Sequence, residues 1–266
     1  MALMLDKKID PTGLDAYKPA EVALRIEEAG VTKAGLPALQ LATLSVLAGV
    51  FISLGAAAFT AALVGTTPGF GPARLLAGLI FSTGLVLVIV AGAELFTGNA
   101  LIVMAWVDGR VRLRALLRNW AYAFLGNLAG ALAVVVLMGF SGLLSGPQGE
   151  TARTIAESKA ALGSVEAFTR GILCNMLVCL AVWLTFAARS VTDKILAIVF
   201  PITAFVLLGY EHSVANMYLI PAGWLAGAKV TAGDFLANLI AVTLGNVAGG
   251  AGGVALTYWL AYRPRV

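Results

Sequence analysis

The chain has 266 residues, of which 60% are hydrophobic and only 12% are charged, and its formal net charge is +4. Soluble domains carry roughly 25% charged residues, so this composition excludes a soluble globular protein. We attribute the small positive charge to Lys and Arg in the loops of a membrane protein. We therefore expect no nucleic-acid partner.

The N-terminal segment, residues 1–34, is the most polar part of the chain and has no apolar region typical of a cleavable signal peptide. Within it, residues 19–30 predict a short amphipathic helix, because Pro19 suits the first helical position and Gly30 suits the end. We expect this helix at the cytoplasmic membrane interface, as an anchor rather than as a gating lid.

Long stretches almost free of charge follow, and a transmembrane helix needs about 20 apolar residues. We predict an all-α transmembrane domain over residues 35–262, followed by a short tail, 263–266. Its six predicted helices are 35–63, 75–107, 117–145, 167–188, 195–227 and 233–262. The second and fifth are long for a hydrocarbon core of about 30 Å, so we predict that each is broken into two half-helices at membrane depth.

The two long segments carry the same motif, G-x-E-x-x-x-x-N, at 92–99 and 209–216. A second pair, G-N-x-x-G, follows at 126–130 and 245–249. The sequence therefore predicts two repeats, about 35–145 and 167–262. Three helices per repeat make the repeat inverted, and the glycine pairs indicate close packing at an interface shared by the halves. Acidic residues repeated inside apolar segments are typical of transporters and channels.

Lys and Arg gather in the N-terminal segment, in the loops after the second and fourth predicted helices, and in the tail. Cytoplasmic loops are enriched in these residues, so we expect both termini to be cytoplasmic.

His212 is the only histidine in the chain, and it lies beside Glu211 in the predicted break of the fifth helix. Inside a membrane such a residue indicates a pore or substrate role. The sequence lacks the ligands that a metal site or a haem-bearing redox subunit would need. It also lacks the nucleophile–base set of an intramembrane enzyme. We therefore expect no cofactor and no enzymatic activity. Cys174 and Cys179 are predicted to be buried free thiols.

Glu94 and Glu211 hold equivalent positions in the two motifs. Each could contact the substrate or anchor backbone N–H groups of the break, and we favour anchoring because a carboxylate repels an anion. Asn99 and Asn216, which end the motifs, are expected to anchor the same loops. Thr97 could cap a half-helix or hydrogen-bond His212 or the solute, and these roles are compatible.

Three stretches resemble motifs of the formate/nitrite transporter family: AGAELFTG at 91–98, GILCNMLVCLA at 171–181 and GYEHSVANM at 209–217. The resemblance extends from about residue 20 to 262. It implies an aquaporin-like fold in a homopentamer, with one pore through each protomer, in the bacterial inner membrane. By position it implies a polar pore centre of Thr97, Asn175, Glu211 and His212. It also implies two apolar constrictions formed by Phe81, Leu95, Val178 and Phe205, and a vestibule lysine, Lys159. Without the resemblance, Lys159 would be interpreted as a solvated surface charge.

A naked anion is far more costly in a low-dielectric constriction than a neutral acid. A vestibule cation and the N–H groups of half-helix ends attract anions. His212, with an unperturbed pKa of about 6.5, could donate a hydrogen bond or a proton to a weak acid. We therefore predict a channel for small monovalent anions, with formate favoured and nitrite or hydrosulfide as alternatives. A neutral-solute facilitator is disfavoured because paired Asn-Pro-Ala motifs are missing.

Overall fold

The computed structural model describes residues 14–67 and 69–262, and within them every regular element is a helix. In chain order the elements are α1 (Pro19–Ala34), α2 (Ala38–Ala62), α3 (Gly71–Val86), the π-helical turn η1 (Leu87–Gly92), the 3-10 turn η2 (Gly98–Ile102), α4 (Val103–Val107), α5 (Leu113–Phe140), the 3-10 turn η3 (Leu143–Ser145), α6 (Pro147–Ala160), α7 (Ser164–Ala187), α8 (Val191–Leu207), α9 (Ser213–Leu225), α10 (Ala232–Val247), the π-helical η4 (Ala248–Leu256) and α11 (Thr257–Tyr262). The first 13 residues and the tail 263–266 lie outside the described part.

Among the described residues, five helical segments are long and apolar enough to cross a membrane, and a shorter apolar segment, Gly98–Val107, accompanies them. The five are Ala38–Ala62, Gly71–Gly92, Leu113–Phe140, Ser164–Ala187 and Ala232–Tyr262. The predicted fifth span, 195–227, corresponds to α8 and α9, which have 17 and 13 residues and are each too short to cross alone. The structure thus has five long apolar helices where the sequence predicted six spans.

Both predicted helix breaks are present. At the first break, α3 continues through η1 to Gly92 and helical structure resumes in η2 at Gly98. At the second break, α8 ends at Leu207 and α9 begins at Ser213. The second break, at 208–212, lies earlier than its motif alone suggests. Gly92 and Gly209 have φ of 88° and 73°, a conformation open to glycine at little cost. These two residues therefore let the chain leave each helix abruptly.

The glycine pairs of the G-x-x-x-G motifs bring backbones into direct contact, as small residues do in membrane proteins. A Cβ placed on Gly130 of α5 would lie 2.1 Å from the carbonyl oxygen of Val46 in α2. A Cβ on Gly249 would lie 2.1 Å from the carbonyl oxygen of Ile172 in α7. Each pair packs within its own half, so the predicted contact between the halves is wrong.

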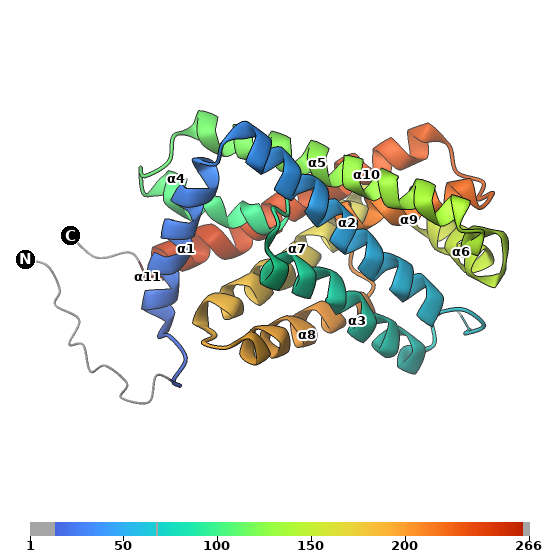
Figure 1. The fold of residues 1–266 in the computed structure, drawn as a ribbon, viewed down its shortest axis with the longest axis horizontal. Coiled ribbons are helices and arrows are strands. Elements are labelled where there is room, and N and C mark those ends of the chain that lie inside the picture. Colours follow the sequence, from blue (N-terminus) through green and yellow to red (C-terminus); the bar gives the residue numbers. More distant parts are fainter. Residues whose placement is uncertain (1–13, 68, 263–266) are drawn as a thin grey trace, which may run out of the picture.

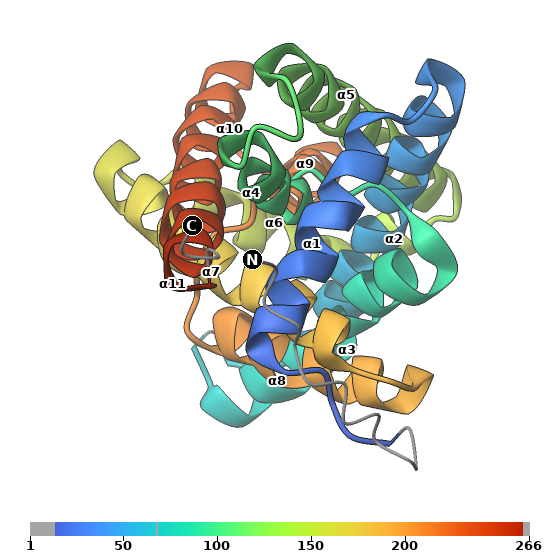
Figure 2. The same cartoon turned by 90° about the vertical axis from the view of Figure 1, so that its left-hand side faces the viewer.

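Helix α1 continues four residues beyond the predicted end at Gly30. Gly30 lies within the helix and allows its close approach to Ala105, instead of ending the helix. A Cβ there would lie 3.1 Å from the Cβ of Ala105. Val22 and Ile26 are also buried, so α1 packs against η2 and α4 of the protein itself. Figure 2 shows α1 crossing this end of the molecule beside α4.

Helix α6 was not predicted. Pro147 begins it, and its residues are too polar for a membrane span. In Figure 1, α6 lies beside α9 at one end of the molecule, and α1 lies beside α4 and α11 at the other end. Helices α3 and α8 lie side by side between these ends (Figure 1), where a Cβ on Gly78 would approach the Thr203 carbonyl oxygen at 3.0 Å.

Candidate transport pathway

A buried polar network surrounds the first break. Lys33 Nζ of α1 lies 2.6 Å from Glu94 Oε1. Asn99 Nδ2 donates to Glu94 Oε2 and to Asn119 Oδ1, both at 2.8 Å. Asn119 Nδ2 in turn donates to the Lys33 carbonyl oxygen at 3.1 Å. The four residues close a ring that ties α1, the break and α5 together.

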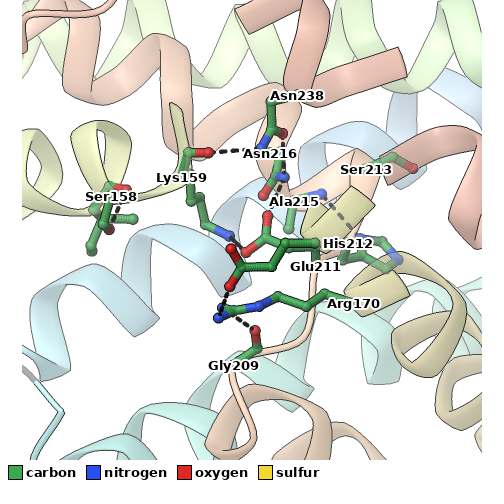
Figure 3. Close-up of polar contacts among 12 residues, drawn as sticks. Ser158, Lys159, Arg170, Gly209, Glu211, His212, Ser213, Ala215, Asn216 and Asn238 are labelled. Atoms are coloured by element: carbon green, nitrogen blue, oxygen red, sulfur yellow. Dashed lines mark hydrogen bonds and ion pairs between the residues drawn. The ribbon is translucent and has the colours of Figure 1, made fainter. Parts of the chain in front are cut away.

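The same ring occurs at the second break (Figure 3). Lys159 Nζ of α6 lies 2.7 Å from Glu211 Oε1. Asn216 Nδ2 donates to Glu211 Oε2 at 2.7 Å and to Asn238 Oδ1 at 2.8 Å. Asn238 Nδ2 donates to the Lys159 carbonyl oxygen at 2.9 Å. Each residue of this ring therefore has an equivalent in the first ring.

A further asparagine in each half satisfies backbone groups of the break. Asn127 Nδ2 donates to the carbonyl oxygen of the motif glutamate at 3.0 Å, and its Oδ1 accepts from the Phe96 amide at 2.9 Å. Asn246 makes the equivalent bonds, both at 2.9 Å, the second from the Ser213 amide. Non-helical backbone at membrane depth needs such partners. The glutamates themselves bind Lys and Asn side chains, rather than the backbone N–H groups that we expected.

Thr97 and His212 join the two breaks. His212 Nε2 lies 2.9 Å from Thr97 Oγ1, across 115 residues of sequence, and both side chains are buried. The Ala215 amide donates to His212 Nδ1 at 3.0 Å, which makes His212 the N-cap of α9. Because Nδ1 accepts this bond, the proton of the neutral ring is on Nε2, and Nε2 donates to Thr97.

Asn175 of α7 completes the group around Thr97. Its Nδ2 donates to the Thr97 carbonyl oxygen at 3.2 Å and to the Asn246 carbonyl oxygen at 2.6 Å. Its Oδ1 is buried and has no hydrogen-bond partner within the described residues. The structure thus brings Thr97, Asn175 and His212 together, with an acceptor still to be satisfied.

The four hydrophobic residues of the predicted constrictions are all buried but are placed differently. The rings of Phe81 and Phe205 meet edge to face at a centroid distance of 5.6 Å. Phe205 also stacks on His212, with centroids 6.0 Å apart. Leu95 and Val178 are each only 2% exposed. Phe81 and Phe205 border the cavity described next, and Leu95 and Val178 do not.

A cavity of about 450 Å³ opens beside α6 and reaches His212. Its walls include Ile155, Lys159, Ala215 and Leu219, together with the two phenylalanines. Lys159 is therefore no solvated surface charge, because its side chain is only 15% exposed and is paired with Glu211.

Beside α1 the equivalent place is nearly closed. A pocket of about 20 Å³ is lined there by Ala29, Lys33, Gly98 and Ile102, among others. These are the counterparts, by position in the two repeats, of Ile155, Lys159, Ala215 and Leu219. Among the described residues, the larger opening towards His212 is therefore the one beside α6.

Three members of the rings, Lys33, Asn119 and Asn238, were not identified from the sequence. A signal for the asparagines exists, because Asn119 precedes Asn127 by the same spacing as Asn238 precedes Asn246. Lys33 offers none beyond its position before an apolar helix. Cys174 and Cys179 are buried free thiols, as expected.

Comparisons with known proteins show the family to which the chain belongs. The formate/nitrite transporter family model matches residues 20–260. The chain is 41% identical to the formate channel FocA of Escherichia coli K12, over 93% of this chain and 95% of that one. It is 39% identical to a probable formate transporter of Methanothermobacter thermautotrophicus, over 94% and 98%.

Two solved structures are similar as well. An FNT family ion channel superposes with a TM-score of 0.86 at 31% identity, covering 91% of this chain and 98% of that one. A pentameric formate channel with formate bound superposes with a TM-score of 0.78 at 36% identity, covering 85% and 98%. The chain is therefore a multi-pass membrane protein of the formate/nitrite transporter family, a family of transporters and not of enzymes.

Proposed function

We propose that the protein is a membrane channel for small monovalent anions, with formate as the favoured substrate. The observation that carries the proposal is the hydrogen bond between His212 and Thr97. It lies where a cavity ends against buried hydrophobic side chains, which is the place where an anion has to lose its water. Relatives named as formate channels, at 41% and 37% identity, support formate over nitrite or hydrosulfide.

Passage is proposed to be linked to a proton at His212. In the arrangement described, the ring is a neutral donor through Nε2. Protonation of Nδ1 displaces the Ala215 amide, so a change in ring charge is coupled to the start of α9. Thr97 accepts from Nε2 and so keeps its own hydroxyl hydrogen for a solute. Asn175 Oδ1 offers an acceptor to the O–H group of a neutral acid.

The remaining site residues have supporting roles in this proposal. Phe81 and Phe205 form the constriction on the cavity side, and Leu95 and Val178 form the second one. Lys159 lines the vestibule and fixes Glu211, while Glu94, Asn99 and Asn216 anchor the broken segments. The contacts described above support the roles of the phenylalanines, Lys159 and the ring residues, whereas the role of Leu95 and Val178 is supported by the resemblance to the formate/nitrite transporter family.

The architecture is proposed to be an aquaporin-like inverted 3+3 repeat in a homopentamer, with both termini cytoplasmic. Two observations support it: the matched rings at the two breaks, and the opposite ends at which the equivalent helices α1 and α6 lie (Figure 1). The pentamer is supported by the similar solved channel, which is pentameric.

Uptake of formate, nitrite, hydrosulfide and glycerol into proteoliposomes tests the proposal. We expect saturable formate uptake that rises as the pH falls, and no acceleration of glycerol entry over empty liposomes. Uptake of nitrite or hydrosulfide without uptake of formate would show that formate is not the substrate and would favour the anion that is taken up. Glycerol entry alone would favour the neutral-solute facilitator.

A further inference from the structure

Three cationic side chains line the cavity, and they differ in their partners. Lys159 is paired with Glu211 at 2.7 Å. Arg170 Nη2 is paired with Glu166 at 2.5 Å, and its Nη1 donates to the Gly209 carbonyl oxygen at 3.1 Å. Arg74 also lines the cavity, and within the described residues its guanidinium group has no ion pair and no hydrogen bond. The unneutralised positive charge of the cavity wall is therefore that of Arg74.

Arg74 is held close to the second break. It lies in the first turn of α3 and is half-buried. Its Nη2 lies 2.9 Å from the position that a Cβ would take on Gly209. Gly209 begins the short segment that leads to Glu211 and His212. The guanidinium group thus lies on the wall that a solute follows towards the histidine.

We propose that Arg74 is an anion-binding residue of this cavity, where it holds a small carboxylate or a similar monovalent oxoanion before that anion reaches His212. The inference rests on the proposed function and assigns the first binding step to a named residue. A guanidinium group pairs with both oxygens of a carboxylate through parallel N–H donors. A paired lysine adds little net field at a distance, whereas an unpaired cation in a partly enclosed cavity concentrates anions.

Kinetics of formate uptake by the full-length protein in proteoliposomes give the first test. We expect Arg74→Gln to raise the half-saturating formate concentration about threefold to tenfold at low ionic strength, with little change in maximal rate. The difference should shrink as salt screens the charge. Arg74→Lys, which keeps the charge and loses the planar fork, should fall between the two. Lys229→Gln is the matched control, because Lys229 is an exposed cation outside the cavity lining.

Charge can also be restored chemically at the same position. Arg74→Cys should be accessible to methanethiosulfonate reagents applied on both sides of the membrane. A reagent with an ammonium group should lower the half-saturating concentration again, and one with a sulfonate group should raise it further. Cys174 and Cys179 are buried, so the wild-type protein treated in the same way is the control for the labelling.

The outcomes separate this inference from the function it rests on. If wild-type protein takes up formate and Arg74→Gln has wild-type kinetics at low salt, the inference is wrong and the proposed function stands. The same holds if both reagents change Arg74→Cys equally, since size rather than charge then matters. If the wild type carries nitrite instead, the comparison is made with nitrite. If it carries none of the anions, the proposed function and this inference both fail.

Discussion

Leu95 occupies in the first half of the protein the position that His212 occupies in the second. Each directly follows the glutamate of its motif, and the two glutamates belong to equivalent rings, with Asn99 bound to Glu94 at 2.8 Å and Asn216 bound to Glu211 at 2.7 Å. The two breaks thus share a framework but present different side chains to the centre. One break carries a buried apolar side chain and the other a hydrogen-bond donor.

His212 has two separable roles, and two substitutions distinguish them. His212→Phe removes both the cap of α9 and the titratable ring, and we expect a loss of stability of about 1 kcal/mol. His212→Asn keeps a side-chain acceptor for the Ala215 amide, so it should retain that stability. Both variants should lose the dependence of formate uptake on pH between about pH 5 and 7.

The measurements are thermal unfolding in detergent and initial uptake rates across that pH range. Wild-type pH dependence in His212→Asn would contradict the proposed proton-linked role of the ring. Equal stability of His212→Phe and the wild type would contradict the capping role.

The Lys33–Glu94 pair should respond unequally to loss of either partner, because the two side chains are 31% and 6% exposed. Lys33→Met leaves a buried carboxylate without its cation and should cost about 3 kcal/mol. Glu94→Gln leaves a lysine that water can reach, and should cost less than about 1 kcal/mol. The double variant should recover much of the loss of Lys33→Met. Thermal unfolding of the three variants checks this, and equal losses for both single variants would contradict it.

Gly249→Ala should weaken the contact between η4 and α7, since the added methyl group would lie 2.1 Å from the Ile172 carbonyl oxygen. Overpacking of this kind costs about 3 kcal/mol at the upper end of its range. Gly163→Ala is the control, because a Cβ there meets nothing within 4 Å and its φ of −64° suits alanine. The stability of the two purified variants is compared, and a Gly249→Ala protein as stable as the control would show that the helices can separate at little cost.

Glu27 of α1 gives a prediction about pH outside the membrane. Burial raises the pKa of its carboxyl group above the ordinary value of 4.5, and Asp108 raises it further, whereas Arg110 opposes the shift. Folding therefore favours the protonated acid, and the penalty for ionisation appears as the pH rises through the raised pKa. Glu27→Gln should unfold at a higher temperature than the wild type at pH 7, and this gain should vanish below about pH 4. The exposed neighbour Glu28, changed to Gln, serves as the control and should show no such gain. A Glu27→Gln gain that is the same at both pH values would contradict the assignment.

The sequence was sufficient for the apolar segments, the two breaks and the residues within the repeated motifs, because these follow from local composition and spacing. It was not sufficient for the partners of those residues. Lys33 meets Glu94 across 61 residues, through the packing of α1 against the broken segment. The same packing keeps α1 helical past Gly30, where a local rule predicted its end. Lys159 looked like a surface charge because nothing local indicates α6, the helix that carries it to Glu211.

The unequal cavities of the two halves have a consequence for how a solute is handled. A cavity of about 450 Å³ leads to His212 from the α6 end, whereas its counterpart beside α1 measures about 20 Å³. In this structure a solute therefore has more room to approach His212 from the α6 end than from the α1 end. Under the proposed function, passage beyond His212 needs the small pocket between α1 and Gly98 to widen. Impermeant probes of the two faces should accordingly find one side of the protein reactive and the other protected.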